Sequence, residues 1–159
     1  MMVISDSSPI TNLIQIDCLD LLNAVFGKII IPQTVYNELC ELPEQKKILD
    51  GQDWISVVAA ENRSAITQLE TQLDKGEAEA IALAMELHPD FLIIDELKGR
   101  TIAEGMGIKI VGLLGTLLKA KQLGHISELK PKLEQLVEVG FRINPQLYNH
   151  VLRVAGEGV

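Results

Sequence analysis

The feature that most constrains the fold is the alternation, along the whole chain, of short apolar runs with longer segments of helical periodicity. We expect strands at residues 2–5, 28–31, 54–58, 91–94 and 108–111. We expect helices at residues 10–16, 18–26, 32–41, 63–73, 77–87, 97–106, 113–122, 126–139 and 145–155. Continuous apolar strands are typical of a parallel sheet that helices cover on both faces. The sequence therefore predicts an α/β fold, a three-layer α/β/α sandwich with a central, mainly parallel sheet.

The length of 159 residues fits one domain spanning residues 1–159, with the C-terminal helices beginning at about residue 126. Hydrophobic residues make up 47% of the chain, which is enough to fill a core. The two cysteines, Cys18 and Cys40, are too few for a disulfide framework. The first residues lack the basic region of a signal peptide, and no apolar run reaches the ~18 residues of a membrane span. We therefore expect a cytoplasmic protein that has no membrane partner.

The chain is acidic, with 14 Lys and Arg against 22 Asp and Glu and a net charge of −8. Tight binding to nucleic acid normally relies on a basic surface, so this composition argues against a protein that simply grips a phosphate backbone. The composition is compatible with an enzyme in which divalent cations lie between protein carboxylates and substrate phosphates. The question is then whether the fold gathers the carboxylates.

Two acids directly follow expected strands, Asp6 after the first and Asp95 after the fourth. The carboxyl ends of parallel strands meet at one edge of the sheet, where ligands of such folds bind. Each of the two acids could instead be only a helix N-cap. For Asp6 we favour a functional role, because Ser8, which precedes Pro9, is better placed to cap the next helix.

Three glutamates in the expected helices need a closer look. Glu38, taken alone, could be an ordinary solvated residue. Glu77 has the spacing of a capping box with Asp74, which gives it a structural role. Glu79 lies about 200° from Glu77 around a helix that is apolar on nearly all sides, and a buried carboxylate needs a partner. We therefore expect Glu79, and not Glu77, to reach a site, with a metal ion as its partner.

Four segments have an order and spacing that together are specific, although each alone is weak. They are residues 3–10 (VISDSSPI), 31–39 (IPQTVYNEL), 76–84 (GEAEAIALA) and 92–100 (LIIDELKGR). These segments resemble the PIN-domain nucleases. The closest likeness is to a prokaryotic subfamily of unknown function that is related to the VapC-type toxins and has a tail similar to residues 118–121 and 140–143. The resemblance covers almost the whole chain, to about residue 157.

The resemblance implies a ribonuclease, a hydrolase that cleaves RNA with a water activated by bound Mg²⁺ or Mn²⁺. Carried over position by position, the metal-binding and catalytic acids are Asp6, Glu38, Glu79 and Asp95. VapC-type members usually have Asp at the third position, whereas the closer subfamily resembles this chain in having Glu there. The resemblance also implies the toxin of a toxin–antitoxin pair, a small antitoxin that blocks the acidic cleft, and a homodimer.

Residues near Asp95 are weaker candidates. Glu96 could share the metal, or it could simply be favourable in the first turn of the next helix. Arg100 could bind a substrate phosphate, or it could pair with Glu104 one turn along the same helix. Lys98 is a further candidate for substrate contact.

The alternative function is a non-catalytic PIN-like module that binds RNA or a protein. A pure scaffold has no reason to gather unpaired carboxylates, so the nuclease is favoured. Another Mg²⁺-dependent phosphate enzyme is disfavoured, because Ser8 occupies the position at which phosphatases of this kind need a second Asp.

Overall fold

A computed structural model describes residues 1–158 and contains a five-stranded, all-parallel sheet. The strands are β1 (Val3–Ser5), β2 (Ile29–Pro32), β3 (Ile55–Val58), β4 (Phe91–Ile93) and β5 (Ile110–Val111). Their order is β3-β2-β1-β4-β5, so β1 lies in the centre between β2 and β4. The predicted α/β fold is confirmed, and the sheet is entirely parallel.

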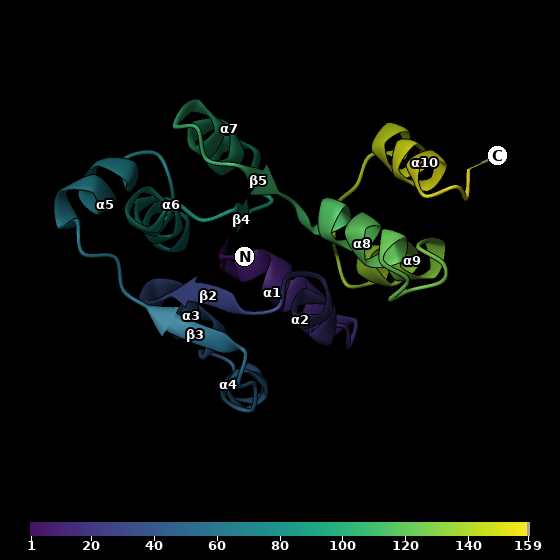
Figure 1. Cartoon of the computed structure of the whole chain (residues 1–159), viewed down its shortest axis with the longest axis horizontal. Helices are drawn as coiled ribbons and strands as arrows, with labels where there is room; N and C mark the ends of the chain where they lie inside the picture. The colour runs from purple at the N-terminus through teal and green to yellow at the C-terminus, as the bar shows by residue number, and fades with distance from the viewer. Residues whose placement is uncertain (159) are drawn as a thin grey trace.

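Helices cover both faces of the sheet. They are α1 (Ser7–Gln15), α2 (Asp20–Phe26), α3 (Gln33–Leu39), α4 (Pro43–Asp50), α5 (Arg63–Leu69), α6 (Lys75–Leu87), α7 (Leu97–Gly105), α8 (Leu113–Gln122), α9 (Lys130–Glu138) and α10 (Pro145–Val154). Figure 1 shows α5, α6 and α7 on the left of the sheet and α1, α2 and α8 on its right. Successive side chains of a strand point to opposite faces. Val3 therefore packs in the core beneath α1, α2 and α8, and Ile4 packs in the core beneath α5 and α6.

The helices differ from the prediction by more than two residues at four places. Helix α1 begins at Ser7, so Asp6 and not Ser8 occupies the N-cap position, although the Asp6 side chain makes no capping hydrogen bond. Helix α4 lies in a mostly polar stretch for which we had no prediction, and it buries only Gln45 and Leu49. Helix α5 ends at Leu69 instead of residue 73, and α9 begins at Lys130 instead of about residue 126.

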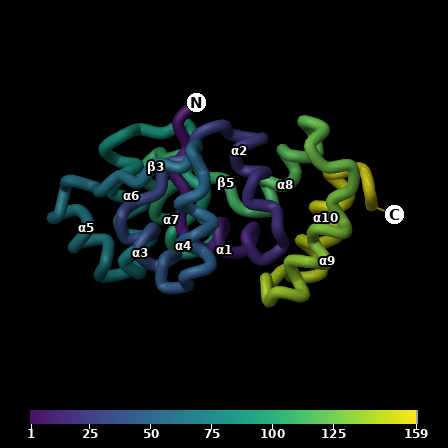
Figure 2. Tube along the Cα trace, turned by 90° about the horizontal axis from the view of Figure 1, so that it is seen from below, coloured from purple at the N-terminus to yellow at the C-terminus, as the bar shows by residue number. Residues whose placement is uncertain are grey.

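The last two helices lie at one end of the molecule, far from α5 at the other end (Figure 2). The carboxylate of Glu157 links the C-terminal segment to α8 and to the start of α9. It pairs with Lys121 Nζ of α8 at 2.6 Å and accepts hydrogen bonds from the N–H groups of Leu129 and Lys130, at 2.7 and 3.0 Å, where α9 begins. In the part of the chain that the structure describes, no helix combines the length and apolarity needed to cross a membrane.

Candidate metal centre

The fold brings Asp6 and Asp95 to the same edge of the sheet, as predicted from their positions after two strands. Strands β1 and β4 are parallel neighbours, with Ser5 opposite Ile93. The N–H of Asp6 donates to the carbonyl oxygen of Ile93 at 2.9 Å, so the chain leaves β1 alongside the end of β4. Both side chains therefore lie at the carboxyl edge, where ligands of parallel sheets bind.

Asp6 belongs to a group of carboxylates whose charges act on one another. This acidic cluster consists of Asp6, Glu38, Asp74, Glu77 and Asp95. Burial, together with the charges of Asp74, Glu38 and Asp95 and against the opposing hydrogen bond from the Ser7 N–H, raises the pKa of Asp6 to about 7. A carboxyl group with this pKa is poised to bind either a proton or a cation at neutral pH.

Glu77 also belongs to the acidic cluster, because the capping box uses only one of its two carboxylate oxygens. The predicted capping box is present: Asp74 Oδ1 accepts from the Glu77 N–H at 2.8 Å, and Glu77 Oε1 accepts from the Asp74 N–H at 3.4 Å. The other oxygen, Oε2, is buried without a hydrogen-bond partner and lies against Gly99 of α7. Burial, with the neighbouring charges of Asp74 and Asp6, raises the pKa of Glu77 to about 8.

Glycines allow the other two members of the cluster to approach neighbouring backbone. A Cβ at Gly76 would lie 2.8 and 2.9 Å from the two carboxylate oxygens of Glu38. A Cβ at Gly112 would lie 2.9 Å from Asp95 Oδ1, which accepts from the Leu113 N–H at 2.8 Å. Burial raises the pKa of both Glu38 and Asp95.

Glu79 is placed differently from our expectation. It is buried, as predicted, but backbone N–H groups occupy both of its oxygens: Oε1 accepts from Thr34 at 2.7 Å and Oε2 from Ala60 at 3.0 Å. These bonds join α6 to the start of α3 and to the chain after β3, so they supply the partner for which we had invoked a metal. The charge of Asp6 thus acts on Glu77, whereas both oxygens of Glu79 are bonded to backbone. A capping box uses only one carboxylate oxygen of its glutamate. The spacing of Asp74 and Glu77 in the sequence therefore already indicated that the second oxygen of Glu77 is available to another partner.

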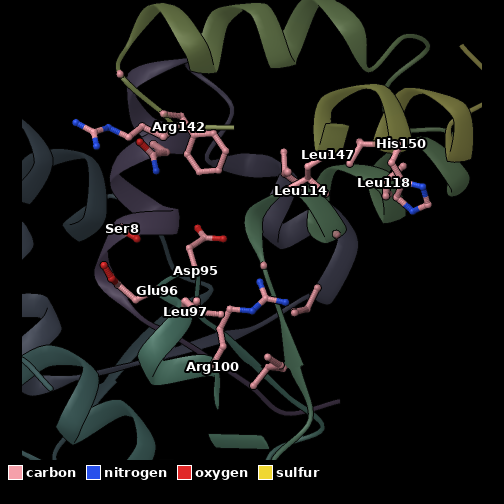
Figure 3. Close-up of a pocket in the computed structure, with 18 residues that line it drawn as sticks. Ser8, Asp95, Glu96, Leu97, Arg100, Leu114, Leu118, Arg142, Leu147 and His150 are labelled. Carbon is pink, nitrogen blue, oxygen red and sulfur yellow. The ribbon is translucent and has the colours of Figure 1, made fainter. Parts of the chain in front are cut away.

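The weaker candidates lie around Asp95. Glu96 is exposed at the N-cap of α7, and Figure 3 shows its carboxylate directed away from that of Asp95. Arg100 is half-buried, and its charge lowers the pKa of Asp95 against the larger effect of burial. Among residues 1–158, Arg100 forms no ion pair with Glu104. Lys98 is exposed on α7.

The donor set fits a hard divalent cation, although within residues 1–158 no three His, Cys, Asp or Glu side chains already converge as a complete set of metal ligands. In the same residues, the buried side-chain polar atoms without hydrogen-bond partners are Asp6 Oδ1, Glu77 Oε2 and Asp95 Oδ2. All three are carboxylate oxygens of the acidic cluster. Buried polar atoms are rarely left unpaired, and Mg²⁺ and Mn²⁺ prefer carboxylate oxygens.

Comparison with known proteins agrees with this fold. A sequence model described as a PIN domain matches residues 2–157, which is nearly the whole chain. No curated protein and no solved structure gives a significant match. The fold, the acids at the carboxyl ends of neighbouring strands and this match together show that the chain belongs to the PIN-domain family.

Proposed function

We propose that the chain is a ribonuclease, a hydrolase of RNA phosphodiester bonds that depends on Mg²⁺ or Mn²⁺. The observation that carries the proposal is the set of three buried carboxylate oxygens that lack hydrogen-bond partners, on Asp6, Glu77 and Asp95. An unpaired buried carboxylate destabilises a fold, so a site that retains three of them supports a role in binding a cation.

The side chains have distinct roles in this proposal. Asp6, Glu77 and Asp95 would hold the cation with their unpaired oxygens, and Glu38 would contribute from the edge of the cluster. A bound divalent cation supplies a water of lowered pKa and neutralises charge on the substrate phosphate. The Leu113 N–H fixes the other oxygen of Asp95, which keeps the unpaired oxygen aimed at the site.

The biological role is proposed from the resemblance to VapC-type toxins. We propose that the protein is the toxin of a toxin–antitoxin pair, acts as a homodimer in the cytoplasm and is inhibited by a small antitoxin at the acidic cluster. A non-catalytic PIN-like module that binds RNA or protein is the alternative, and the lack of a complete set of converged metal ligands in residues 1–158 favours it. Metal binding and cleavage distinguish the two.

The test is cleavage of a mixed single-stranded RNA with Mg²⁺ or Mn²⁺ by the wild type and by four variants, Asp6→Asn, Asp95→Asn, Glu77→Gln and Glu79→Gln. We expect the first three to lose about 10²–10³-fold or more in rate, by analogy with removal of one preorganised group from an active site. The fourth should keep the activity of its folded fraction, because Glu79 is bonded to backbone elsewhere.

Calorimetric titration with Mn²⁺ gives a second readout that does not depend on turnover. The wild type and Glu79→Gln should bind Mn²⁺, and Glu77→Gln should bind it more weakly. A folded wild type that neither binds Mn²⁺ nor cleaves RNA would leave the interaction module as the function. If Glu79→Gln loses Mn²⁺ binding and Glu77→Gln binds Mn²⁺ as the wild type does, the third metal-binding acid is Glu79 and not Glu77.

A further inference from the structure

A cleft of about 950 Å³ opens beside the acidic cluster and shares only Asp95 with it (Figure 3). It lies between the start of α7, one side of α8, and the chain from Gly140 to Val151. Its volume is within the range of pockets that bind small organic molecules, about 300–1,000 Å³. Whatever occupies this cleft therefore adjoins the proposed metal-binding carboxylates.

The cleft has an apolar wall and a polar wall. Leu114, Leu118 and Leu147 form part of the apolar wall, and Figure 3 shows them on the far side of the cleft from Ser8. Arg100 and Arg142 also line the cleft, and in Figure 3 they stand on either side of Asp95. These are two of the four arginines in a chain of net charge −8, and in the lining of this cleft they stand against only two carboxylates, those of Asp95 and Glu96.

The ordered end of α9 positions Phe141 and Arg142. Gly140 has φ 99°, and its N–H donates to the Val137 carbonyl at 3.1 Å, while the Phe141 N–H donates to the Leu136 carbonyl at 2.9 Å. This pair of bonds is a Schellman motif, in which glycine favours the left-handed conformation. Phe141 is partly buried against the core, and both Phe141 and Arg142 line the cleft.

We infer that this cleft binds an unpaired nucleotide of the RNA next to the scissile phosphate. The base would lie on Phe141 and the leucine wall, and Arg100 and Arg142 would bind flanking phosphates. An aromatic ring next to guanidinium groups is typical of single-strand recognition, because a base must leave its stack to reach the ring. The inference rests on the proposed function for its substrate, and it makes Phe141 and Arg142 residues that position the substrate.

The test measures RNA binding in EDTA, where no cleavage occurs, by fluorescence anisotropy of a labelled single strand and of a hairpin duplex. Arg142→Ala should weaken binding of the single strand roughly five- to tenfold and lower the slope of log affinity against log salt by about 0.7. Phe141→Leu keeps apolar volume but removes the ring, and should weaken binding by roughly 5- to 100-fold. The hairpin should bind more weakly than the single strand.

Arg63→Ala is the matched control, since it removes the same charge from an exposed position on α5, at the opposite end of the molecule (Figure 2). Arg142→Lys keeps the charge without the bidentate fork and should fall between the wild type and Arg142→Ala. Circular dichroism confirms that each variant is folded. In cleavage assays, Arg142→Ala should raise KM and leave kcat unchanged, as expected when uniform binding is lost.

The outcomes separate this inference from the proposed function. If the wild type binds RNA through Phe141 and Arg142 but never cleaves it, the nuclease proposal fails and the binding cleft stands. If the wild type cleaves RNA while both variants keep its affinity and KM, the cleft is not a nucleotide site. If Arg142→Ala and Arg63→Ala lose RNA affinity equally, the effect comes from overall charge and not from the cleft. A wild type that binds no RNA would also overturn the inference.

Discussion

Replacing Asp6 by asparagine is expected to stabilise the metal-free protein, which is unusual for a change at a buried residue. The Asp6 residue is 4% exposed, and its Oδ1 has no hydrogen-bond partner. The amide of asparagine has nearly the same shape, carries no charge and offers donors to the carboxylates around it. The same substitution removes a proposed metal ligand, so stability and metal binding should change in opposite directions.

The magnitude follows from the pKa. Burial, with the surrounding acids, raises the pKa of Asp6 from 3.8 to about 7. Burying its charge therefore costs roughly 4 kcal/mol well above pH 7, at about 1.4 kcal/mol per pH unit. Between these two pH values folded Asp6 binds more protons than unfolded Asp6, so its contribution to stability falls as the pH rises from about 4 to about 7 and then levels off. Rearrangement of the cluster lowers the cost, so we expect Asp6→Asn to gain about 2 kcal/mol at pH 8 and little at pH 4.

The assay is urea unfolding in EDTA at pH values from 4 to 8, with Glu79→Gln as the paired variant. Glu79 is also a buried acid, but both oxygens accept backbone N–H bonds. Its amide variant should lose about 1–3 kcal/mol, because one N–H is left without an acceptor. Excess Mn²⁺ should then stabilise the wild type by mass action and leave Asp6→Asn unchanged. A loss of stability in Asp6→Asn at pH 8, or a gain that does not vary with pH, would refute the reasoning.

Three further predictions concern other parts of the site and the fold. Mn²⁺ affinity, measured by calorimetry, should rise between pH 6 and pH 8, because acids whose pKa is raised to about 7 and about 8 must lose protons before they bind a cation; a flat profile would contradict this. Gly76→Ala should leave the fold intact but weaken Mn²⁺ binding, because the added Cβ would displace the Glu38 carboxylate. In the control Gly51→Ala, the added Cβ would meet only backbone carbonyl oxygens at 3.5 Å, so this variant should bind Mn²⁺ as the wild type does. For Glu157, burial alone would raise the pKa, but hydrogen bonds from Lys121 and from two N–H groups of the chain lower it to about 2. Its contribution to stability is present above about pH 4.5 and lost toward pH 2, so Glu157→Gln should unfold more easily than the wild type at neutral pH, and the difference should vanish in acid.

The sequence was sufficient for the architecture and for part of the site. Continuous apolar runs mark strands that are buried on both faces, and an acid directly after such a run lies at the carboxyl edge whatever the loops do. The sequence therefore placed Asp6 and Asp95 at one edge, and the order of β1 and β4 bears this out. The spacing of Asp74 and Glu77 likewise predicted the capping box, because a capping box is local.

What only the tertiary structure decided is which of Glu77 and Glu79 keeps a buried oxygen without a hydrogen-bond partner. Whether Glu77 or Glu79 is free to face Asp6 depends on how α6 is rotated against the sheet and on which N–H groups are near. Those groups belong to Thr34 and Ala60, far from Glu79 in sequence, and no local pattern reveals them. The cleft beside Asp95 has the same origin, since its walls come from segments that are joined only by packing. Periodicity fixes which side of an element is buried, but the partner of a buried polar atom is set by contacts between distant segments.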